Sequence, residues 1–162
     1  MYILLSLASI KFQLIPRKIG LFFGRQLGAF IYYCIPLRKS YARRNLEIAF
    51  PELPSAERQK ILKACYKHFG MVLIDFLRMP KFKRNKDKIT VRIPQETVDL
   101  YNHHNGGILL SAHVGNWEFI GPALGIHQIK IAGVTRVQRN SHSDRFFNEM
   151  RSSETVKTIP FN

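Results

Sequence analysis

From Gly106 onward the sequence changes from helical periodicity to short apolar runs, and this change constrains the fold more than any other feature. The run Ile108–Ser111 follows a glycine turn and is typical of a strand covered on both faces. A helix is expected over Asn116–Ile126, and a second run, Ile129–Thr135, is rich in β-branched residues. Strand, helix and strand at this spacing predict a βαβ unit with a parallel sheet. The sequence therefore predicts the α/β class.

Before Gly106 the apolar residues recur at helical spacing. Residues 37–50 place an apolar face opposite a basic face, and Pro51 and Pro54 end this helix. The next helix is expected to begin at a capping Ser55, and it carries the strongest apolar stripe of the chain. The stripe consists of Ile61, Leu62, Cys65, Phe69, Val72, Leu73, Phe76 and Leu77. A last helix is expected over Ser143–Arg151.

The N-terminal residues are unusually apolar. Residues 1–10 contain no charge, and residues 19–36 are interrupted only by Arg25. Neither run reaches the roughly 18–20 apolar residues of a spanning helix, and neither has the layout of a signal peptide. We expect two helical pieces that lie in or dip into one membrane face, with basic residues at the headgroups. The alternative is a pair of buried core helices.

Two regions follow from this pattern: residues 1–36, the membrane-associated apolar helices, and residues 37–162, the α/β portion. The chain carries 25 Lys and Arg against 11 Asp and Glu, a formal net charge of +14. Such a surface favours an anionic partner, which is a nucleic acid, an anionic membrane face or an acidic protein. Residues 78–92 are especially basic, and they form either a solvated surface or a contact surface for phosphates or an acidic carrier protein.

The residues best placed for chemistry are His113 and Glu118. His113 follows the predicted strand at its carboxyl end, where open α/β sheets place their ligands. Glu118 lies in the first turns of the next helix, so its carboxylate can reach back to the imidazole. A carboxylate on one ring nitrogen raises the basicity of the other, which can then deprotonate an alcohol. Backbone N–H groups at the helix start suit a developing oxyanion. The alternative is that His113 has only a structural role in the turn between strand and helix.

Other chemistries are poorly supported by the sequence. Ser111 lacks the glycine-flanked elbow of a serine hydrolase, and no glycine-rich phosphate loop is present. Cys34 and Cys65 have no metal-ligand spacing and are expected to be small buried hydrophobes. No cofactor or metal is therefore expected.

Three segments together resemble a known family. Gly106–Glu118, with the sequence GGILLSAHVGNWE, is similar to the signature of the lipid A biosynthesis lauroyl/myristoyl acyltransferases of the glycerolipid acyltransferase superfamily. Residues 43–53 resemble an upstream element of that family. Arg136, Asn140, Asp144 and Arg151 follow its pattern after the second predicted strand. The resemblance runs from about residue 16 to residue 151.

The resemblance implies a reaction and a setting. An acyl chain would pass from acyl carrier protein to a hydroxyl of a lipid A precursor or a related anionic glycolipid. The site would be the cytoplasmic face of the inner membrane of a Gram-negative cell. His113 would be the general base with Glu118 as its partner, and Arg136, Asn140 and Asn116 would bind substrate.

The resemblance also implies the architecture. Apolar N-terminal helices would precede a glycerolipid-acyltransferase-like α/β domain with a central, partly parallel sheet. Members of the family are about twice this length, so residues 37–162 would be the N-terminal portion of that domain.

Two alternatives remain open. The chain is also compatible with an inactive, truncated, membrane-associated remnant of such an enzyme. A basic nucleic-acid-binding module is the other reading, but the sequence has no recognition-helix signature, aromatic platform or zinc knuckle. We therefore expect no nucleic-acid partner.

Overall fold

The computed structural model describes residues 1–35, 37–104 and 106–161, which form two compact units. We call Ile10–Arg78 the helical unit, and Met1–Ser9 together with Met79–Asn162 the sheet unit. The elements are α1 (Tyr2–Leu14), α2 (Arg17–Cys34), α3 (Lys39–Ala49), α4 (Ser55–Leu77), α5 (Met79–Arg84), η1 (Lys86–Lys88), α6 (Gln95–His103), η2 (Trp117–Phe119), α7 (Ile120–Ile126), β1 (Ile131–Arg136), α8 (Ser141–Arg151) and β2 (Val156–Phe161).

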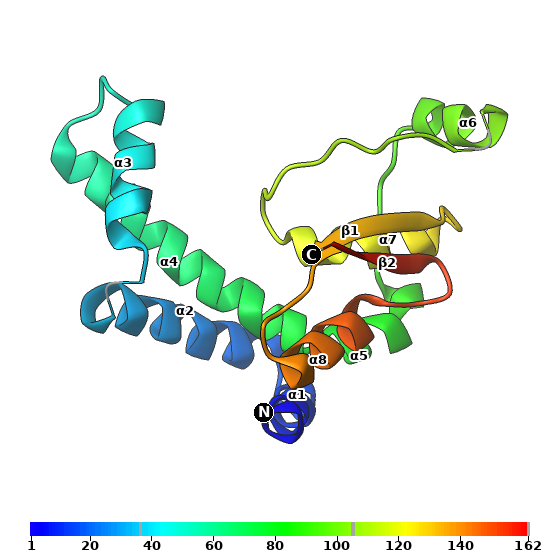
Figure 1. Ribbon diagram of the computed structural model, residues 1–162, viewed down its shortest axis with the longest axis horizontal. Helices are drawn as coiled ribbons and strands as arrows, with labels where there is room; N and C mark the ends of the chain where they lie inside the picture. The colour runs from blue at the N-terminus through cyan, green and yellow to red at the C-terminus, as the bar shows by residue number, and fades with distance from the viewer. Residues whose placement is uncertain (36, 105, 162) are drawn as a thin grey trace. The chain divides into compact units, whose positions relative to one another are not determined.

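The helical unit is organised by the close packing of α2 against α4 (Figure 1). Gly20, Gly24 and Gly28 form the buried face of α2 together with Tyr32. A Cβ added at Gly24 would lie 2.6 Å from the carbonyl oxygen of Gly70 on α4. The two backbones are thus in direct contact at Gly24 and Gly28, where a side chain would collide with the backbone of α4.

Polar contacts fasten the end of α4 to the start of α2. Asp75 is buried, and its carboxylate accepts two hydrogen bonds from Arg17, at 2.9 Å from Nε and 2.5 Å from Nη2. The buried Arg78 donates to the main-chain oxygens of Phe12 and Ile15. The link between α1 and α2 is therefore held by charged side chains from α4 and its C-cap.

Both helices predicted in this region are confirmed, with two corrections. The N-cap of α4 is Pro54, without a side-chain hydrogen bond, so Ser55 is the first helical residue rather than the cap. The fixed φ of proline suits this position, and Arg58 instead donates to the oxygen of Leu53 in the preceding turn. Cys34 and Cys65 are exposed, not buried, because each of these helices buries only part of its surface.

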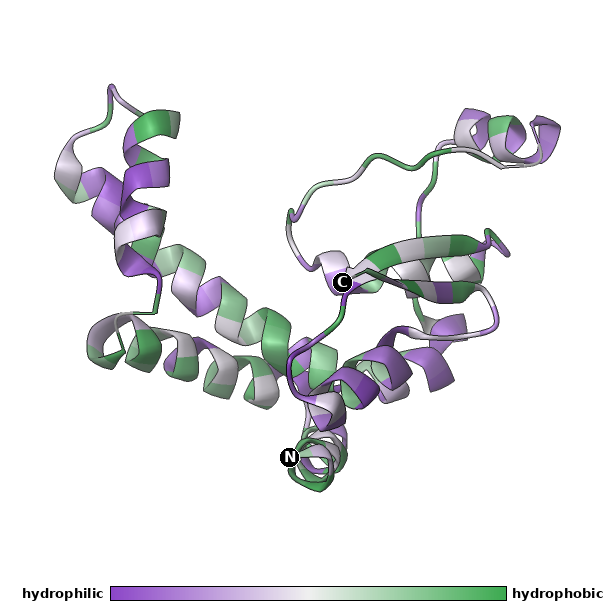
Figure 2. Ribbon diagram, in the orientation of Figure 1, coloured by the Kyte–Doolittle hydropathy of each residue, from purple (hydrophilic) through white to green (hydrophobic). Residues whose placement is uncertain are grey.

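Many apolar residues of α1 and α2 are exposed. Figure 2 shows apolar residues along much of these two helices, in contrast to the hydrophilic α8. The exposed set comprises Ile3, Leu4, Leu7, Ile10, Leu14, Ile19, Phe22, Phe23, Leu27, Phe30 and Tyr33. Within the described residues, no helix combines the length and the apolar character needed to cross a bilayer. Membrane association of residues 1–36, and the division at that point, stay predictions.

The sheet unit is built on two parallel strands, β1 and β2, with register from Ile131↔Val156 to Arg136↔Phe161. The helix α8 connects the strands, and α7 packs against them (Figure 1). A Cβ added at Gly121 on α7 would lie 3.2 Å from the side chain of Val156. The predicted α/β class with a parallel sheet is confirmed in this part of the chain.

The predicted strand Ile108–Ser111 is not formed. Residues 106–116 have no regular secondary structure, and the side chains of Ile108 and Leu110 are 101% and 94% exposed. An extended segment becomes a strand only when a neighbour supplies hydrogen bonds, and in the described residues β1 pairs with β2 alone. The βαβ unit is therefore β1–α8–β2, one step later than predicted, and β2 itself was not predicted.

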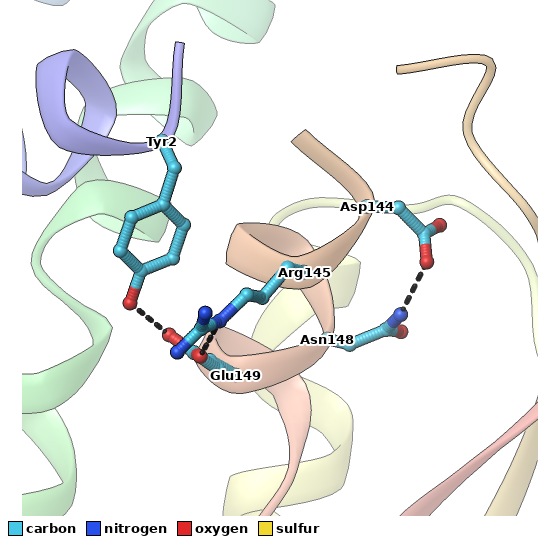
Figure 3. Close-up of polar contacts among 5 residues, drawn as sticks. All are labelled: Tyr2, Asp144, Arg145, Asn148 and Glu149. Atoms are coloured by element: carbon cyan, nitrogen blue, oxygen red, sulfur yellow. Dashed lines mark hydrogen bonds and ion pairs between the residues drawn. The ribbon is translucent and has the colours of Figure 1, made fainter. Parts of the chain in front are cut away.

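The first turn of α1 is attached to α8 within the sheet unit (Figure 3). The hydroxyl of Tyr2 donates to Glu149, which also accepts a hydrogen bond from Arg145 at 2.8 Å. The ring of Tyr2 meets the buried Phe146 edge to face, with centroids 6.3 Å apart. The start of α1 thus packs against α8 within this unit.

Candidate active site

A groove of about 440 Å³ runs along the sheet unit between α7 and the two strands. Three of the residues predicted to act on substrate, His113, Glu118 and Arg136, line it together. The remaining lining residues are Trp117, Ile120, Gly121, Pro122, Ile131, Gly133, Val134, Thr135, Gln138, Arg151, Val156, Lys157 and Thr158. The lining combines apolar side chains with the charged groups of Arg136, Arg151 and Lys157, which suits a ligand with an apolar part and an anionic part.

His113 lies at the end of the exposed segment 106–116, and its own side chain is exposed. The imidazole is close to the indole of Trp117, with ring centroids 4.8 Å apart and ring planes inclined at 38°. Between them the chain turns at Gly115, whose φ of +59° is in the left-handed region that favours glycine. The imidazole is therefore held beside the groove and open to a substrate.

Glu118 is held by an arginine from α8. Its carboxylate accepts from Arg151 at 2.9 Å from Nε to Oε2 and 2.6 Å from Nη2 to Oε1. The Glu118 side chain is 11% exposed and that of Arg151 is 27% exposed. Two parallel, charge-assisted bonds of this kind fix the plane of the carboxylate as well as its position.

The two predicted catalytic residues share the groove without a direct bond. In the described part of the chain no hydrogen bond joins His113 to Glu118, and both carboxylate oxygens of Glu118 accept a hydrogen bond from Arg151. An ionised carboxylate has about four acceptor positions, and Arg151 uses two of them. Glu118 can therefore accept an imidazole N–H without releasing Arg151, and the predicted His113–Glu118 pair stays a prediction.

The three predicted substrate-binding residues differ in their surroundings. Arg136 ends β1 and presents an exposed side chain to the groove. Asn140 is the N-cap of α8, where its Oδ1 accepts from the backbone N–H of Ser143 at 3.0 Å. Asn116 has a buried amide with neither polar atom hydrogen-bonded. The exposed position of Arg136 fits direct contact with substrate, whereas the side chain of Asn140 already binds the backbone of α8.

Sequence reasoning did not identify what holds Glu118. Arg151 was noted only as part of the family pattern, because its partner is 33 residues away and no local spacing links them. Asp144, the other residue noted in that pattern, accepts from the backbone N–H of Gln138 at 2.8 Å. It also accepts from the side-chain amide of Asn148 at 2.9 Å, a contact drawn in Figure 3. It therefore ties the loop after β1 to α8. The described residues contain no group of three His, Cys, Asp or Glu arranged to hold a metal ion.

Comparison with known proteins gives a consistent result. Lipid A biosynthesis palmitoleoyltransferase of Escherichia coli (strain K12) is 33% identical over 61 residues, which is 38% of this chain and 20% of that protein. Lipid A biosynthesis acyltransferase of Shigella flexneri matches with the same identity and coverage. The match thus spans about a fifth of the length of these relatives.

No solved structure matches the chain significantly. The family described as bacterial lipid A biosynthesis acyltransferase, however, matches residues 2–162. Because this match covers nearly the whole sequence, the chain belongs to the bacterial lipid A biosynthesis acyltransferase family.

Proposed function

We propose that the groove beside His113 transfers a fatty acyl chain from acyl carrier protein to a hydroxyl of a lipid A precursor or a related glycolipid. The observation that carries this proposal is that His113, Glu118 and Arg136 line the same groove. Family membership supports the reaction class. The exposed imidazole supports access by an acceptor that approaches from outside.

In the proposed mechanism His113 is the general base. One ring nitrogen removes the proton of the acceptor hydroxyl as its oxygen attacks the carbonyl carbon of the acyl thioester. The tetrahedral intermediate then expels the carrier thiolate, which takes its proton from the imidazolium. Glu118 stabilises the imidazolium, and the two hydrogen bonds from Arg151 keep the Glu118 carboxylate oriented. No side-chain nucleophile and no cofactor are needed.

The positive charge in the groove lining supports an anionic acceptor. Arg136 and Lys157 both line the groove, and the side chain of Arg136 is exposed. A guanidinium binds a phosphate through two parallel hydrogen bonds, so Arg136 is the residue we assign to a phosphate of the glycolipid. The excess of basic residues in the chain also suits an acidic carrier protein.

We further propose that the chain works at the cytoplasmic face of the inner membrane, with the apolar faces of α1 and α2 in the bilayer interface. Replacing Phe22 and Phe30 by serine should lower binding to anionic vesicles severalfold in high salt. Serine at Ile48, which is more exposed than either phenylalanine but lies on the hydrophilic α3, should not. Equal binding by all three proteins would contradict the assignment of this face, and release by salt alone would favour a nucleic-acid or purely electrostatic partner.

The reaction is tested by mass spectrometry of membranes that contain the full chain. Acyl carrier protein loaded with mixed chain lengths is the donor, and a tetraacylated lipid A precursor is the acceptor. We expect a product heavier by one acyl chain, lost in His113→Ala and retained in the control His142→Ala, which changes an exposed histidine outside the groove. Product from His113→Ala at the normal rate would exclude His113 as the base. Membrane binding without any product would favour an inactive, membrane-associated chain.

A further inference from the structure

Lys83 on α5 binds the main chain on both sides of Arg151. Its Nζ donates to the carbonyl oxygens of Met150 and Ser152, each at 2.7 Å. The side chain is half-buried, and this burial lowers the pKa of Lys83. An ammonium group withdrawn from water is costly unless it is hydrogen-bonded, so these two bonds are what make the position tolerable.

The acceptors are groups at the end of a helix. Met150 is in the last turn of α8, where carbonyl groups have no partner within the helix, and Ser152 is its C-cap. The C-terminal end of a helix also carries a partial negative charge, which favours a nearby cation. Lys83 therefore fixes the backbone at the point from which the Arg151 side chain departs.

The neighbour of Lys83 contacts the other side of the ion pair. Phe82 packs against Phe119, with ring centroids 4.3 Å apart and ring planes at 72°. Phe119 directly follows Glu118 in η2. The short helix α5 thus contacts both the segment that carries the carboxylate and the segment that carries the guanidinium. Met150, whose carbonyl oxygen binds Lys83, lies 67 residues after it in the sequence.

We propose that Lys83 is a positioning residue that holds Arg151, and through it the Glu118 carboxylate, in the geometry needed for acyl transfer. This proposal rests on the proposed function of the groove. Lys83 does not line the groove, so it acts on the reaction only through Arg151. Displacing a reacting group by about 1 Å can lower a rate about a hundredfold, so a small shift of this backbone is enough to be measured.

The first experiment compares kinetic constants of the full chain in membranes. Lys83→Met removes the ammonium group but keeps much of the apolar stem, and it should lower kcat by roughly tenfold to a hundredfold with KM changed less than about twofold. Lys83→Arg should recover most of the rate, because a guanidinium still donates to both carbonyls. Lys130→Met is the control, since Lys130 is exposed and outside the groove.

A double variant shows whether Lys83 acts through Arg151. If it does, Lys83→Met combined with Arg151→Met is no slower than Arg151→Met alone. If the two losses multiply instead, Lys83 acts by another route and the proposal is wrong.

A second readout does not depend on activity. In ¹H–¹⁵N spectra the Arg151 Nε–H, which is bonded to Glu118 at 2.9 Å, should exchange slowly with water in the wild type and at least tenfold faster in Lys83→Met. The exchange should return to the slow rate in Lys83→Arg, which also decides the question if Lys83→Met does not fold. An Arg151 signal that is unaffected by Lys83→Met overturns the proposal. Absence of transfer by the wild type would reject the proposed function, while the spectra still test the positioning.

Discussion

At the scale of single residues, Glu118 shows how a side chain can be placed by a partner that is remote in sequence. Its carboxylate is 11% exposed and is oriented by a bidentate contact with Arg151. The spacing of His113 and Glu118 was visible in the sequence because both lie in one segment. The arginine was not, since a contact over 33 residues depends on how α8 packs.

Removing this arginine should destabilise the sheet unit. Arg151→Met leaves Glu118 largely shielded from water without its cation, which we expect to lower the free energy of unfolding by about 2 kcal/mol. The matched control is Arg145→Met, which breaks an exposed i,i+4 pair with Glu149 and should have a clearly smaller effect, because water screens an exposed ion pair. Urea unfolding of both variants measures the difference, and equal costs would contradict a stabilising role for the Glu118–Arg151 pair.

A second residue separates a structural role from a substrate role. Asn140 caps α8, so Asn140→Ala should lower stability by about 1 kcal/mol, whereas Asn140→Asp retains a capping oxygen and should not. Stability is measured by thermal unfolding and acyl transfer by mass spectrometry. A stable Asn140→Asp protein with normal activity would leave Asn140 as a cap only, and one with lost activity would support the predicted contact with substrate.

At the scale of elements, periodicity in the sequence predicted α3, α4, α8 and β1, because each has apolar residues in a pattern typical of a helix or a strand. It failed where pairing between distant segments decides the outcome. Ile108–Ser111 is apolar enough for a strand, yet it is exposed and unpaired among the described residues. The strand β2 was missed because Val156–Phe161 contains Lys157 and Pro160, which weaken a strand pattern and are tolerated at a sheet edge.

The packing of α2 on α4 gives a graded prediction. A Cβ added at Gly28 would lie 2.7 Å from the Cα of Lys67, so Gly28→Ala must push the helix backbones apart. At Gly20 the nearest atom is the Cγ2 of Ile74, at 3.1 Å, which can move aside. We expect Gly28→Ala to cost about 2–3 kcal/mol and Gly20→Ala less than about 1 kcal/mol by urea unfolding. Similar values for both would show that α2 and α4 do not pack this closely.

At the scale of the whole molecule, the helical unit is one continuous segment, Ile10–Arg78, between two pieces of the sheet unit. No pattern in the sequence indicated that Met1–Ser9 would join the sheet unit, because this depends on contacts of Tyr2 with Phe146 and Glu149 on α8. Apolar content suggested a division at residue 36, which concerns association with a membrane. The two units are defined by packing within the chain, so they do not test that division. Composition predicted an anionic partner but left its class open.

The exposed segment 106–116 should be the first site of proteolysis. Leu109 and Leu110 are 57% and 94% exposed and lie outside regular secondary structure, so a protease specific for large apolar residues can bind them extended. Leu62 and Leu77, at 2% and 6% exposure, should resist. Brief digestion followed by mass spectrometry should give fragments that meet near residues 109–110. Initial cleavage within α4 would contradict this order.

The Glu118–Arg151 contact also imposes an order of events during translation. Glu118 leaves the ribosome 33 residues before Arg151, and at a synthesis rate of roughly 5–20 residues per second the wait is roughly 2 to 7 s. During that time the Glu118 carboxylate has no arginine partner and stays hydrated, so its position relative to His113 is not yet fixed. The nascent chain therefore acquires its groove only after both α8 and β2 have been synthesised.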